Sequence, residues 1–169
     1  GLTDVMEGAH RPGHFDGVAT VVTKLFTQTA ATDAFFGEKD YQQFMVVRRM
    51  ARDLDIPITV HGCPTIRDID GLALSSRNLL LSDRARTTAP VLFEEMEKIT
   101  DGLRAGRDFA DLQAQATARL ERAGFTGVDY LDLRAQEDLS ALTAPTRPAR
   151  LFAAAWLAGV RLIDNIAVD

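Results

Sequence analysis

The chain has 169 residues, of which 46% are apolar and 25% are charged, and its formal net charge is −5. This length suits one domain or two small ones with an ordinary core. The mildly acidic balance argues against a broad nucleic-acid-binding surface, although a local basic pocket could still bind phosphates.

Cysteine content and hydropathy indicate the compartment. Cys63 is the single cysteine, so no disulfide can form within the chain, and a reducing, cytoplasmic location is expected. No apolar run approaches the roughly 18 residues of a membrane helix, and no basic and then apolar leader opens the sequence. Because Gly1 rather than Met comes first, we expect a chain that has been processed, tagged or shortened.

The first part of the sequence predicts a βαβ unit. Apolar residues at helical spacing predict a helix over residues 15–26, and residues 33–37 are typical of a short buried strand. A second helix is predicted over residues 40–54 and a second strand over residues 56–62. Strands joined in this way should run parallel, and such sheets bind ligands beyond the carboxyl ends of their strands.

Two helices are predicted next. Ser82 is the expected cap of a helix that runs toward Gly106, with Pro90 kinking or restarting it. Asp108 is expected to cap a second helix that stops at Gly124. Both helices carry apolar residues along one face, which indicates packing on a core.

Predicted strands follow these helices. Residues 128–133 form the first, and residues 151–157 and 160–168 are typical of a hairpin joined at Ala158 and Gly159. Helices followed by antiparallel strands indicate a small α+β domain.

The boundary between the two parts is placed near residue 65, which gives expected domains over residues 1–65 and 66–169. The polar, proline-bearing run 143–148 is predicted to be a surface loop. No internal repeat or low-complexity tract divides the chain further.

The loop after the first predicted strand carries candidate site residues. Gly37 permits a tight turn, Lys39 supplies a cation, and Asp40 opens a helix whose N-terminal N–H groups attract anions. Together they predict a phosphate cradle, although a common turn with a solvated lysine would give the same pattern. Gln43 could hydrogen-bond a substrate carboxylate or hydroxyl, or could form a capping box with Asp40.

The loop after the second predicted strand is also polar. Ser75 and Ser76 offer hydroxyls, and Arg77 offers a guanidinium that can grip two phosphate oxygens. A polar surface loop is the alternative interpretation. Asp68 and Asp70 could bind a metal as an acidic pair, but no third ligand is in view, which favours a solvated loop.

The histidines give a weaker signal. His14 could belong to a site or could pack at the start of a helix, and His10 and His61 show no metal-ligand spacing. The sequence has no nucleophile elbow, Walker loop or dinucleotide fingerprint.

Three separated segments resemble the pantothenate synthetase (pantoate–β-alanine ligase) family. They are FGEKDYQQ at residues 36–43, DGLALSSRN at residues 70–78 and RLIDN at residues 161–165. The run RPGHFDGVATVV at residues 11–22 is also similar to that family. The resemblance keeps matching spacing over nearly the whole chain, and three motifs in order are far more specific than any one.

The resemblance implies ATP-dependent condensation of pantoate with β-alanine to pantothenate. The pantoate carboxylate would attack the α-phosphate of ATP to give a pantoyl adenylate and pyrophosphate, and the amine of β-alanine would then displace AMP. The resemblance also implies ATP bound with Mg²⁺ as a substrate complex, no tightly bound cofactor, no nucleic-acid or membrane partner, and a homodimer.

The family's nucleotide-binding residues match positions in both loops. The ATP-binding residues implied by the resemblance are Gly37, Glu38, Lys39, Asp40, Ile66, Leu74, Ser75, Ser76 and Arg77. The catalytic residues among them would be Lys39, Ser75, Ser76 and Arg77. Lys39 would neutralise phosphate charge, Ile66 would lie by the adenine or ribose, and residues 74–77 resemble the mobile KMSKS loop of class I aminoacyl-tRNA synthetases. Gln43 would hold pantoate, and no metal ligand is implied in this chain.

Two departures qualify the resemblance. A methionine is usual where Leu74 stands, and the leucine keeps an apolar contact. The family's His-x-Gly-His element does not occur, and the string from His10 to His14 has the wrong spacing and follows no strand. The chain therefore resembles the C-terminal part of the family: the end of a Rossmann-like nucleotidyltransferase domain over residues 1–65, and a small α+β domain with the KMSKS-like loop over residues 66–169.

Three hypotheses follow. In the first, the longer parent is the ligase and this chain alone is inactive. In the second, the chain is a non-catalytic folded fragment that dimerises or binds nucleotide weakly. In the third, the parent is a related adenylyltransferase with another acid substrate, which Gln43 and residues 11–15 argue against through the resemblance.

Overall fold

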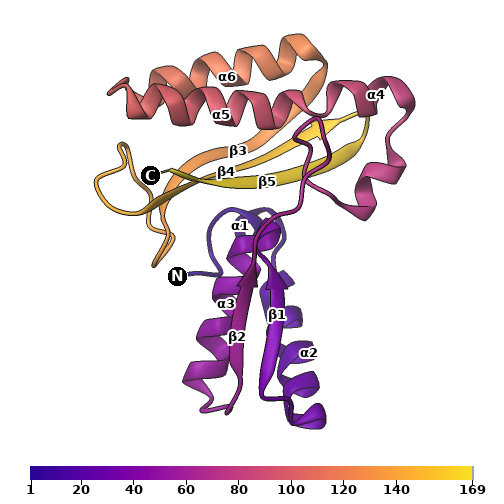
Figure 1. The fold of residues 1–169 in the computed structure, drawn as a ribbon, viewed down its shortest axis with the longest axis vertical. Coiled ribbons are helices and arrows are strands. Elements are labelled where there is room, and N and C mark those ends of the chain that lie inside the picture. Colours follow the sequence, from indigo (N-terminus) through magenta and orange to yellow (C-terminus); the bar gives the residue numbers. More distant parts are fainter. Residues whose placement is uncertain (169) are drawn as a thin grey trace. The chain divides into compact units, whose positions relative to one another are not determined.

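The computed structural model describes residues 1–168 and divides the chain into two compact units, Gly1–Thr65 and Ile66–Asp169. Each unit has its own sheet and helices (Figure 1). Asp169, the last residue of the second expected domain, lies outside the described residues. The predicted α/β class, with parallel strands first and antiparallel strands after them, is confirmed.

The first unit is built on two parallel strands joined by a helix. Its elements are α1 (Glu7–His10), α2 (His14–Thr29), β1 (Asp33–Gly37), the 3₁₀ turn η1 (Glu38–Asp40), α3 (Tyr41–Asp53) and β2 (Thr59–Cys63). β1 pairs in parallel with β2 along its length, with Gly37 opposite Cys63. The predicted βαβ unit is confirmed, and the carboxyl ends of both strands lie at the same edge of the sheet.

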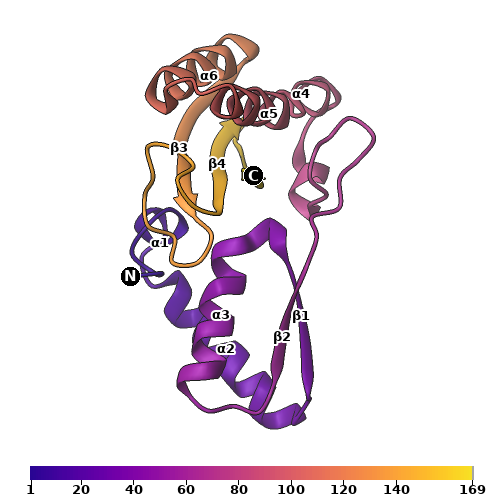
Figure 2. The same cartoon turned by 60° about the vertical axis from the view of Figure 1, so that its left-hand side comes forward.

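Within the first unit, helices cover one face of this sheet. Its core consists of buried side chains from α2 and α3: Val22, Phe26, Val47 and Ala51. Phe36 of β1 packs against that core, and Figure 2 shows both helices on the same side of the strands. Phe35 points the other way and is 70% exposed. The prediction of a buried strand over residues 33–37 is therefore wrong in its burial, because successive strand side chains point to opposite faces.

Gln42 ties the N-terminal segment to α3. Its side chain is buried, and its Oε1 accepts a hydrogen bond from the N–H of Glu7 at 3.1 Å. Its Nε2 donates to the carbonyls of Leu2 and Val5, each at 2.8 Å. A buried amide that satisfies three backbone groups fixes the first residues of the chain against the helix.

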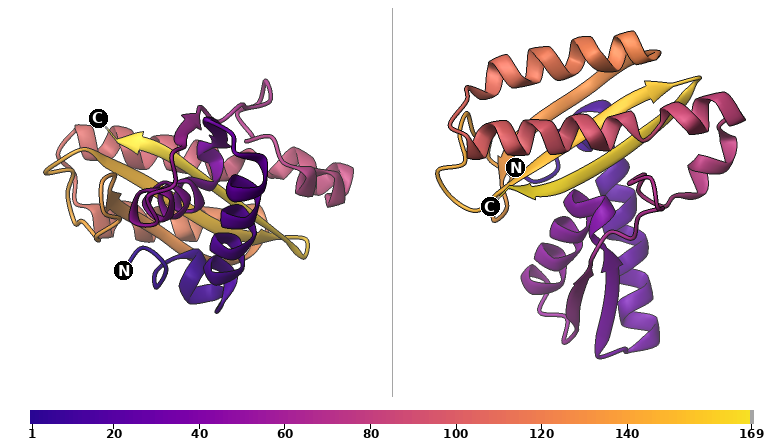
Figure 3. Two further views of the ribbon diagram at one scale, coloured as in Figure 1. Left: turned by 90° about the horizontal axis from the view of Figure 1, so that it is seen from below. Right: turned by 45° about the horizontal axis from the view of Figure 1, so that its top comes forward.

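The second unit is a three-stranded antiparallel sheet covered by helices. Its elements are η2 (Ser76–Leu80), α4 (Asp83–Thr88), α5 (Val91–Arg104), α6 (Phe109–Ala123), β3 (Phe125–Ala135), β4 (Ala149–Leu157) and β5 (Val160–Val168). The strand order is β3–β4–β5. Figures 1 and 3 show α5 and α6 side by side across the sheet. The largest fully buried side chains of this unit are Met96, Ile99, Leu120, Leu133, Leu151 and Val168.

The helix boundaries of this unit agree with the predicted caps. Ser82 Oγ accepts a hydrogen bond from the N–H of Ala85 at 3.3 Å and begins α4, and Asp108 caps α6 in the same way. Gly124 ends α6 with φ of 110°, in the left-handed region. Pro90 separates α4 from α5, so of the predicted kink or restart the structure shows a restart.

The strands of this unit agree with the prediction in type. The turn between β4 and β5 uses left-handed backbone at Ala158 (φ 50°) and Gly159 (φ 78°), as expected for a tight hairpin. β3 is longer than the predicted 128–133, because it pairs with β4 over its whole length through two register shifts. Residues 143–148 are exposed, as predicted. Among the described helices, none combines the length and the hydropathy that a membrane span requires.

Candidate functional site

The turn after β1 gathers four of the candidate residues at the carboxyl edge of the parallel sheet. Gly37 has an ordinary φ of −67°, so its turn does not require glycine. A Cβ at Gly37 would meet no heavy atom of a non-neighbouring residue within 4 Å, which leaves open space for a ligand. Glu38 and Lys39 are half-buried and Asp40 is exposed, all in η1. This edge is where parallel sheets bind ligands.

Glu38 lies across the neighbouring strand. A Cβ at Gly62 would come within 2.7 Å of Glu38 Oε1 and 3.2 Å of the Phe44 ring. The missing side chain at Gly62 therefore makes room for the Glu38 carboxylate over β2. The sequence pattern around Gly62 contained no signal for this contact.

Gln43 follows in the first turn of α3, where its side chain is half-buried. The predicted capping box with Asp40 is wrong, because the Asp40 side chain makes no capping hydrogen bond. Asp40 has φ of −99° and ψ of 55°, since a 3₁₀ turn rather than an extended residue leads into the helix. The structural explanation for Gln43 is thereby removed, and binding of a substrate group by Gln43 stays a prediction.

Two histidines of the first unit have identifiable neighbours. His14 borders a hollow of about 210 Å³ at the start of α2, and its Nε2 lies 3.2 Å from Arg11 Nη1. His61 Nε2 lies 2.7 Å from Asp33 Oδ1 on the open face of the sheet, and its ring stacks on Phe35. The hydrogen bond with His61 lowers the pKa of Asp33 below its ordinary value.

Residues 66–74 form a small hairpin at the start of the second unit. Arg67 and Ala73 form an antiparallel bridge, and the N–H of Leu74 donates to the carbonyl of Ile66 at 2.9 Å. The backbone thus brings Ile66 and Leu74, two expected nucleotide contacts, next to each other. Both side chains are exposed.

Arg67 anchors this hairpin to β5. Its Nη1 and Nη2 donate to the two carboxylate oxygens of Asp164 at 2.5 and 2.9 Å, and Nη1 also donates to the carbonyl of Gly71 at 3.0 Å. Its guanidinium lies 3.9 Å from the centre of the Phe93 ring. A Cβ at Gly71, where φ is 86°, would lie 2.5 Å from the same ring, so both backbone and packing require glycine there.

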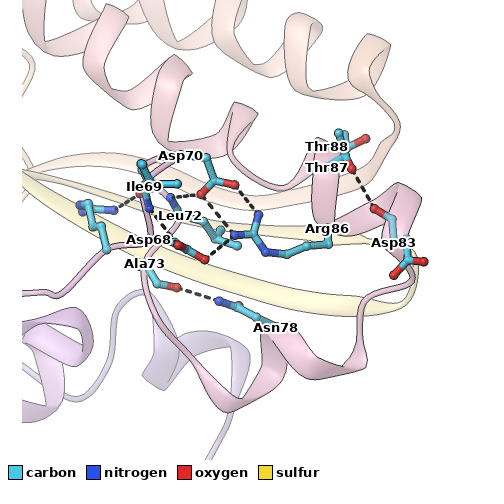
Figure 4. Close-up of polar contacts among 12 residues, drawn as sticks. Asp68, Ile69, Asp70, Leu72, Ala73, Asn78, Asp83, Arg86, Thr87 and Thr88 are labelled. Carbon is cyan, nitrogen blue, oxygen red and sulfur yellow. Dashed lines mark hydrogen bonds and ion pairs between the residues drawn. The ribbon is translucent and has the colours of Figure 1, made fainter.

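Arg86 of α4 holds the turn of the hairpin (Figure 4). Its Nη2 donates to Asp68 Oδ2 at 2.8 Å, and its Nη1 donates to Asp70 Oδ2 at 2.5 Å. The hydrogen bond from Arg86 lowers the pKa of Asp70 below its ordinary value. The two carboxylates considered from the sequence as a metal-binding or solvated pair therefore bind an arginine.

The Asp70–Arg86 pair predicts a pH dependence of stability. A carboxyl whose pKa is lowered by folding adds stability that is complete above its unfolded pKa of about 3.9 and is lost as the pH falls through the folded value. We expect Arg86→Gln to lower stability at pH 7, with a smaller difference from the original chain at pH 3. Urea unfolding at both pH values measures this. Arg84→Gln, at an exposed neighbouring position, is the control, and a difference that grows on acidification would contradict the prediction.

The segment that follows the anchored hairpin is open to solvent. Ser76 and Arg77 are exposed, whereas Ser75 is half-buried. Ser75 Oγ accepts a hydrogen bond from the N–H of Arg77 at 3.2 Å and begins η2. Asn78 Nδ2 donates to the carbonyl of Ala73 at 3.0 Å and closes the turn (Figure 4). Hydrogen bonds thus hold the backbone on both sides of Ser76, and the Ser76 and Arg77 side chains are open to solvent.

The predicted site residues form one group in each unit. Gly37 to Asp40 and Gln43 belong to the first unit, and Ile66 and residues 74–77 belong to the second. Within residues 1–168 no group of three or more His, Cys, Asp and Glu side chains could hold a metal ion. Mg²⁺ that is bound to a nucleotide usually takes only one or two protein carboxylates, and no ligand of Mg²⁺ is assigned here.

Comparison with known proteins places the chain in a family. A family model described as pantoate–beta-alanine ligase matches residues 1–167. Pantothenate synthetase of Roseobacter denitrificans is 70% identical over 168 residues, which cover 99% of this chain and 59% of the relative. Pantothenate synthetase of Ruegeria pomeroyi is 62% identical over 169 residues, with coverages of 100% and 59%. The chain thus spans about 60% of the length of the curated relatives it matches.

Solved structures give the same result for the fold. Pantoate–β-alanine ligase (pantothenate synthetase) from Thermus thermophilus aligns with a TM-score of 0.91 and 46% identity, over 99% of this chain and 60% of that one. Pantoate–β-alanine ligase from Francisella tularensis, complexed with β-γ ATP and β-alanine, aligns with a TM-score of 0.77 and 32% identity, over 98% and 55%. Both similarities extend over almost the whole of this chain.

Proposed function

The chain belongs to the pantoate–β-alanine ligase family, and from this membership we propose that the longer protein to which it corresponds condenses pantoate with β-alanine, using ATP. The observation that carries the proposal is the family match over residues 1–167. The Francisella tularensis relative, solved with β-γ ATP and β-alanine, supports a nucleotide and β-alanine as ligands.

The proposed reaction has two steps. A carboxylate oxygen of pantoate attacks the α-phosphorus of ATP, the bond from the α-phosphorus to the bridging oxygen breaks, and pyrophosphate leaves. The amine of β-alanine then attacks the acyl carbon of the pantoyl adenylate, AMP leaves, and the amine loses a proton to give the amide. Negative charge grows on the phosphates in the first step, so fixed cations and N–H donors aimed at them would lower the barrier.

Lys39 is the proposed cation of the first unit. It lies in the turn beyond β1, beside the open space at Gly37. An ammonium group acts there as a compact point charge, which suits phosphate oxygens. Gly37, Glu38 and Asp40 lie beside it in the chain and are the first unit's other proposed nucleotide contacts. Gln43, in the first turn of α3, is the proposed partner of pantoate.

The second unit supplies the other proposed nucleotide contacts. Ser76 and Arg77 would donate hydrogen bonds to phosphate oxygens, and the Arg77 fork can hold two oxygens at once. Ser75 would act through its hydroxyl, which in this structure caps the N–H of Arg77. Ile66 and Leu74, adjacent and exposed, offer an apolar surface for the adenosine. The proposal also includes two domains with boundaries at residues 1–65 and 66–169, a cytoplasmic homodimer, and Mg²⁺ arriving with ATP.

A chimera tests the proposed function. The part of the Roseobacter denitrificans relative that precedes its match to this chain is joined to residues 1–169. We expect this chimera to exchange pyrophosphate into ATP only when pantoate is present and to form pantothenate when β-alanine is added. Exchange that depends on another carboxylic acid and not on pantoate would overturn the substrate assignment.

The isolated chain gives the complementary prediction. The family's His-x-Gly-His element is absent from this sequence, so the proposed site has only part of its residues. We expect pantoate-dependent exchange by the 169-residue chain to stay at the background rate of a sample without protein. Robust exchange by the isolated chain would contradict this division of the site.

A further inference from the structure

Three buried polar side chains lie on two neighbouring strands of the second sheet. Asp164 and Asn165 of β5 are only 5% and 3% exposed, and Arg150 of the neighbouring β4 is also buried. Burial of such groups costs free energy unless hydrogen bonds and opposite charges compensate for it. Asp164 and Asn165 belong to the RLIDN segment, for which the proposed function gives no role.

Arg67, in the hairpin of residues 66–74, binds one of these buried side chains, Asp164. The Asp164 carboxylate accepts hydrogen bonds from Nη1 and Nη2 of Arg67. Its Oδ1 also accepts a hydrogen bond from the N–H of Asn165 at 2.7 Å. Arg150 Nη1 donates to the Asn165 side-chain oxygen, Oδ1. A bidentate pair of this kind fixes both the distance and the orientation of the guanidinium plane.

The orientation of Arg67 passes directly to the candidate nucleotide segment. Arg67 donates to the carbonyl of Gly71 and lies over the Phe93 ring, so its contacts join the hairpin turn to β5 and α5. The antiparallel bridge between Arg67 and Ala73 then sets the backbone one residue before Leu74. The segment 74–77 therefore leaves the hairpin from a point whose position depends on Asp164.

We propose that Arg67 and Asp164 are positioning residues that hold the segment 74–77 in the geometry needed for adenylation. This inference rests on the proposed function, in which Ser76 and Arg77 contact the nucleotide. Asp164 acts through Arg67 and touches no substrate. A displacement of about 1 Å can lower a rate by roughly 100-fold, so a lost anchor should be visible in catalysis.

The kinetic test uses Asp164→Asn in the chimera, with Asp129→Asn as the matched control. Asp129 also forms an ion pair within this sheet, with Arg161 Nε at 2.7 Å, and accepts a hydrogen bond from Trp156, and neither partner belongs to the hairpin. We expect Asp164→Asn to lower kcat for pantoate-dependent ATP–pyrophosphate exchange by roughly 10- to 100-fold. The KM for pantoate should stay within about twofold of the original value. Asp129→Asn should keep the original kcat, and equal losses in both variants would overturn the proposal.

A double variant separates positioning from folding. Replacing a buried ion pair with apolar residues is often neutral for stability, so Arg67→Met with Asp164→Leu should keep the Tm while kcat falls. A stable double variant with the original kcat would overturn the proposal.

Amide hydrogen exchange of residues 72–77 in the isolated chain provides a readout independent of catalysis. Asp164→Asn should speed it, and Asp129→Asn should not. If the original chimera is inactive, the proposed function fails. The amide hydrogen exchange of the isolated chain still decides whether Asp164 holds the segment 74–77.

Discussion

Replacement of Lys39 by alanine in the chimera is expected to lower the rate of pantoate-dependent ATP–pyrophosphate exchange by about 10²–10³-fold. The effect follows from the proposed role of its ammonium group beside the phosphates, where charge grows as pyrophosphate leaves. The loss should fall mainly on kcat, because the interaction is stronger in the transition state than in bound ATP. Initial exchange rates over a range of ATP concentrations separate kcat from KM.

Two further variants make this result specific. Lys24→Ala removes a lysine from an exposed position of α2 and should leave the rate unchanged. Lys39→Arg keeps the charge but replaces the compact ammonium with a wider guanidinium, so we expect an intermediate loss. A rate for Lys39→Ala within about threefold of the original, far from the loss expected for a catalytic cation, would remove Lys39 from the proposed catalytic residues.

Helix caps are the part of the fold that local sequence predicts well. Ser82, Asp108 and Gly124 each act on backbone groups a few residues away, so their effect hardly depends on the rest of the chain. The turn at Ala158 and Gly159 is equally local. Asp40 fails as a cap because a 3₁₀ turn precedes α3, and the spacing of residues does not reveal that turn.

Burial of a strand depends on segments far away in the sequence. Ala34, Phe35 and Phe36 are consecutive apolar residues, which is typical of a strand covered on both faces. Within the first unit, α2 and α3 cover the face that carries Ala34 and Phe36. No pattern within the strand could have shown which elements cover each face.

Motif order predicts the candidate loops, but it does not predict the contacts that hold them. Arg67 and Asp164 are 97 residues apart, and Arg86 lies 16 residues beyond Asp70. Neither separation follows a helix or strand period. One usable signal existed: an aspartate within the apolar alternation of the last strand requires a partner if it is buried. That signal predicts a partner but does not identify Arg67.

Replacement of Leu151 by alanine is the change with the largest expected effect on stability. Leu151 lies on the central strand β4, is 0% exposed, and stands between Leu133 of β3 and Ile166 of β5. Removing its side chain loses the transfer free energy of the buried carbons and leaves a cavity that a sheet paired on both sides cannot easily close. We expect the free energy of unfolding to fall by about 2–5 kcal/mol.

The single tryptophan makes this loss measurable in the unit that contains it. Trp156 is on the same strand β4, so its fluorescence during urea unfolding reports the unit in which Leu151 lies. Leu80→Ala, at a side chain that is 71% exposed, should change stability by no more than about 0.5 kcal/mol. Leu151→Met keeps most of the buried volume and should cost less than about 1.5 kcal/mol. If Leu151→Ala costs no more than Leu151→Met, the cavity explanation is wrong, and β4 must relax into the space that the smaller side chain leaves.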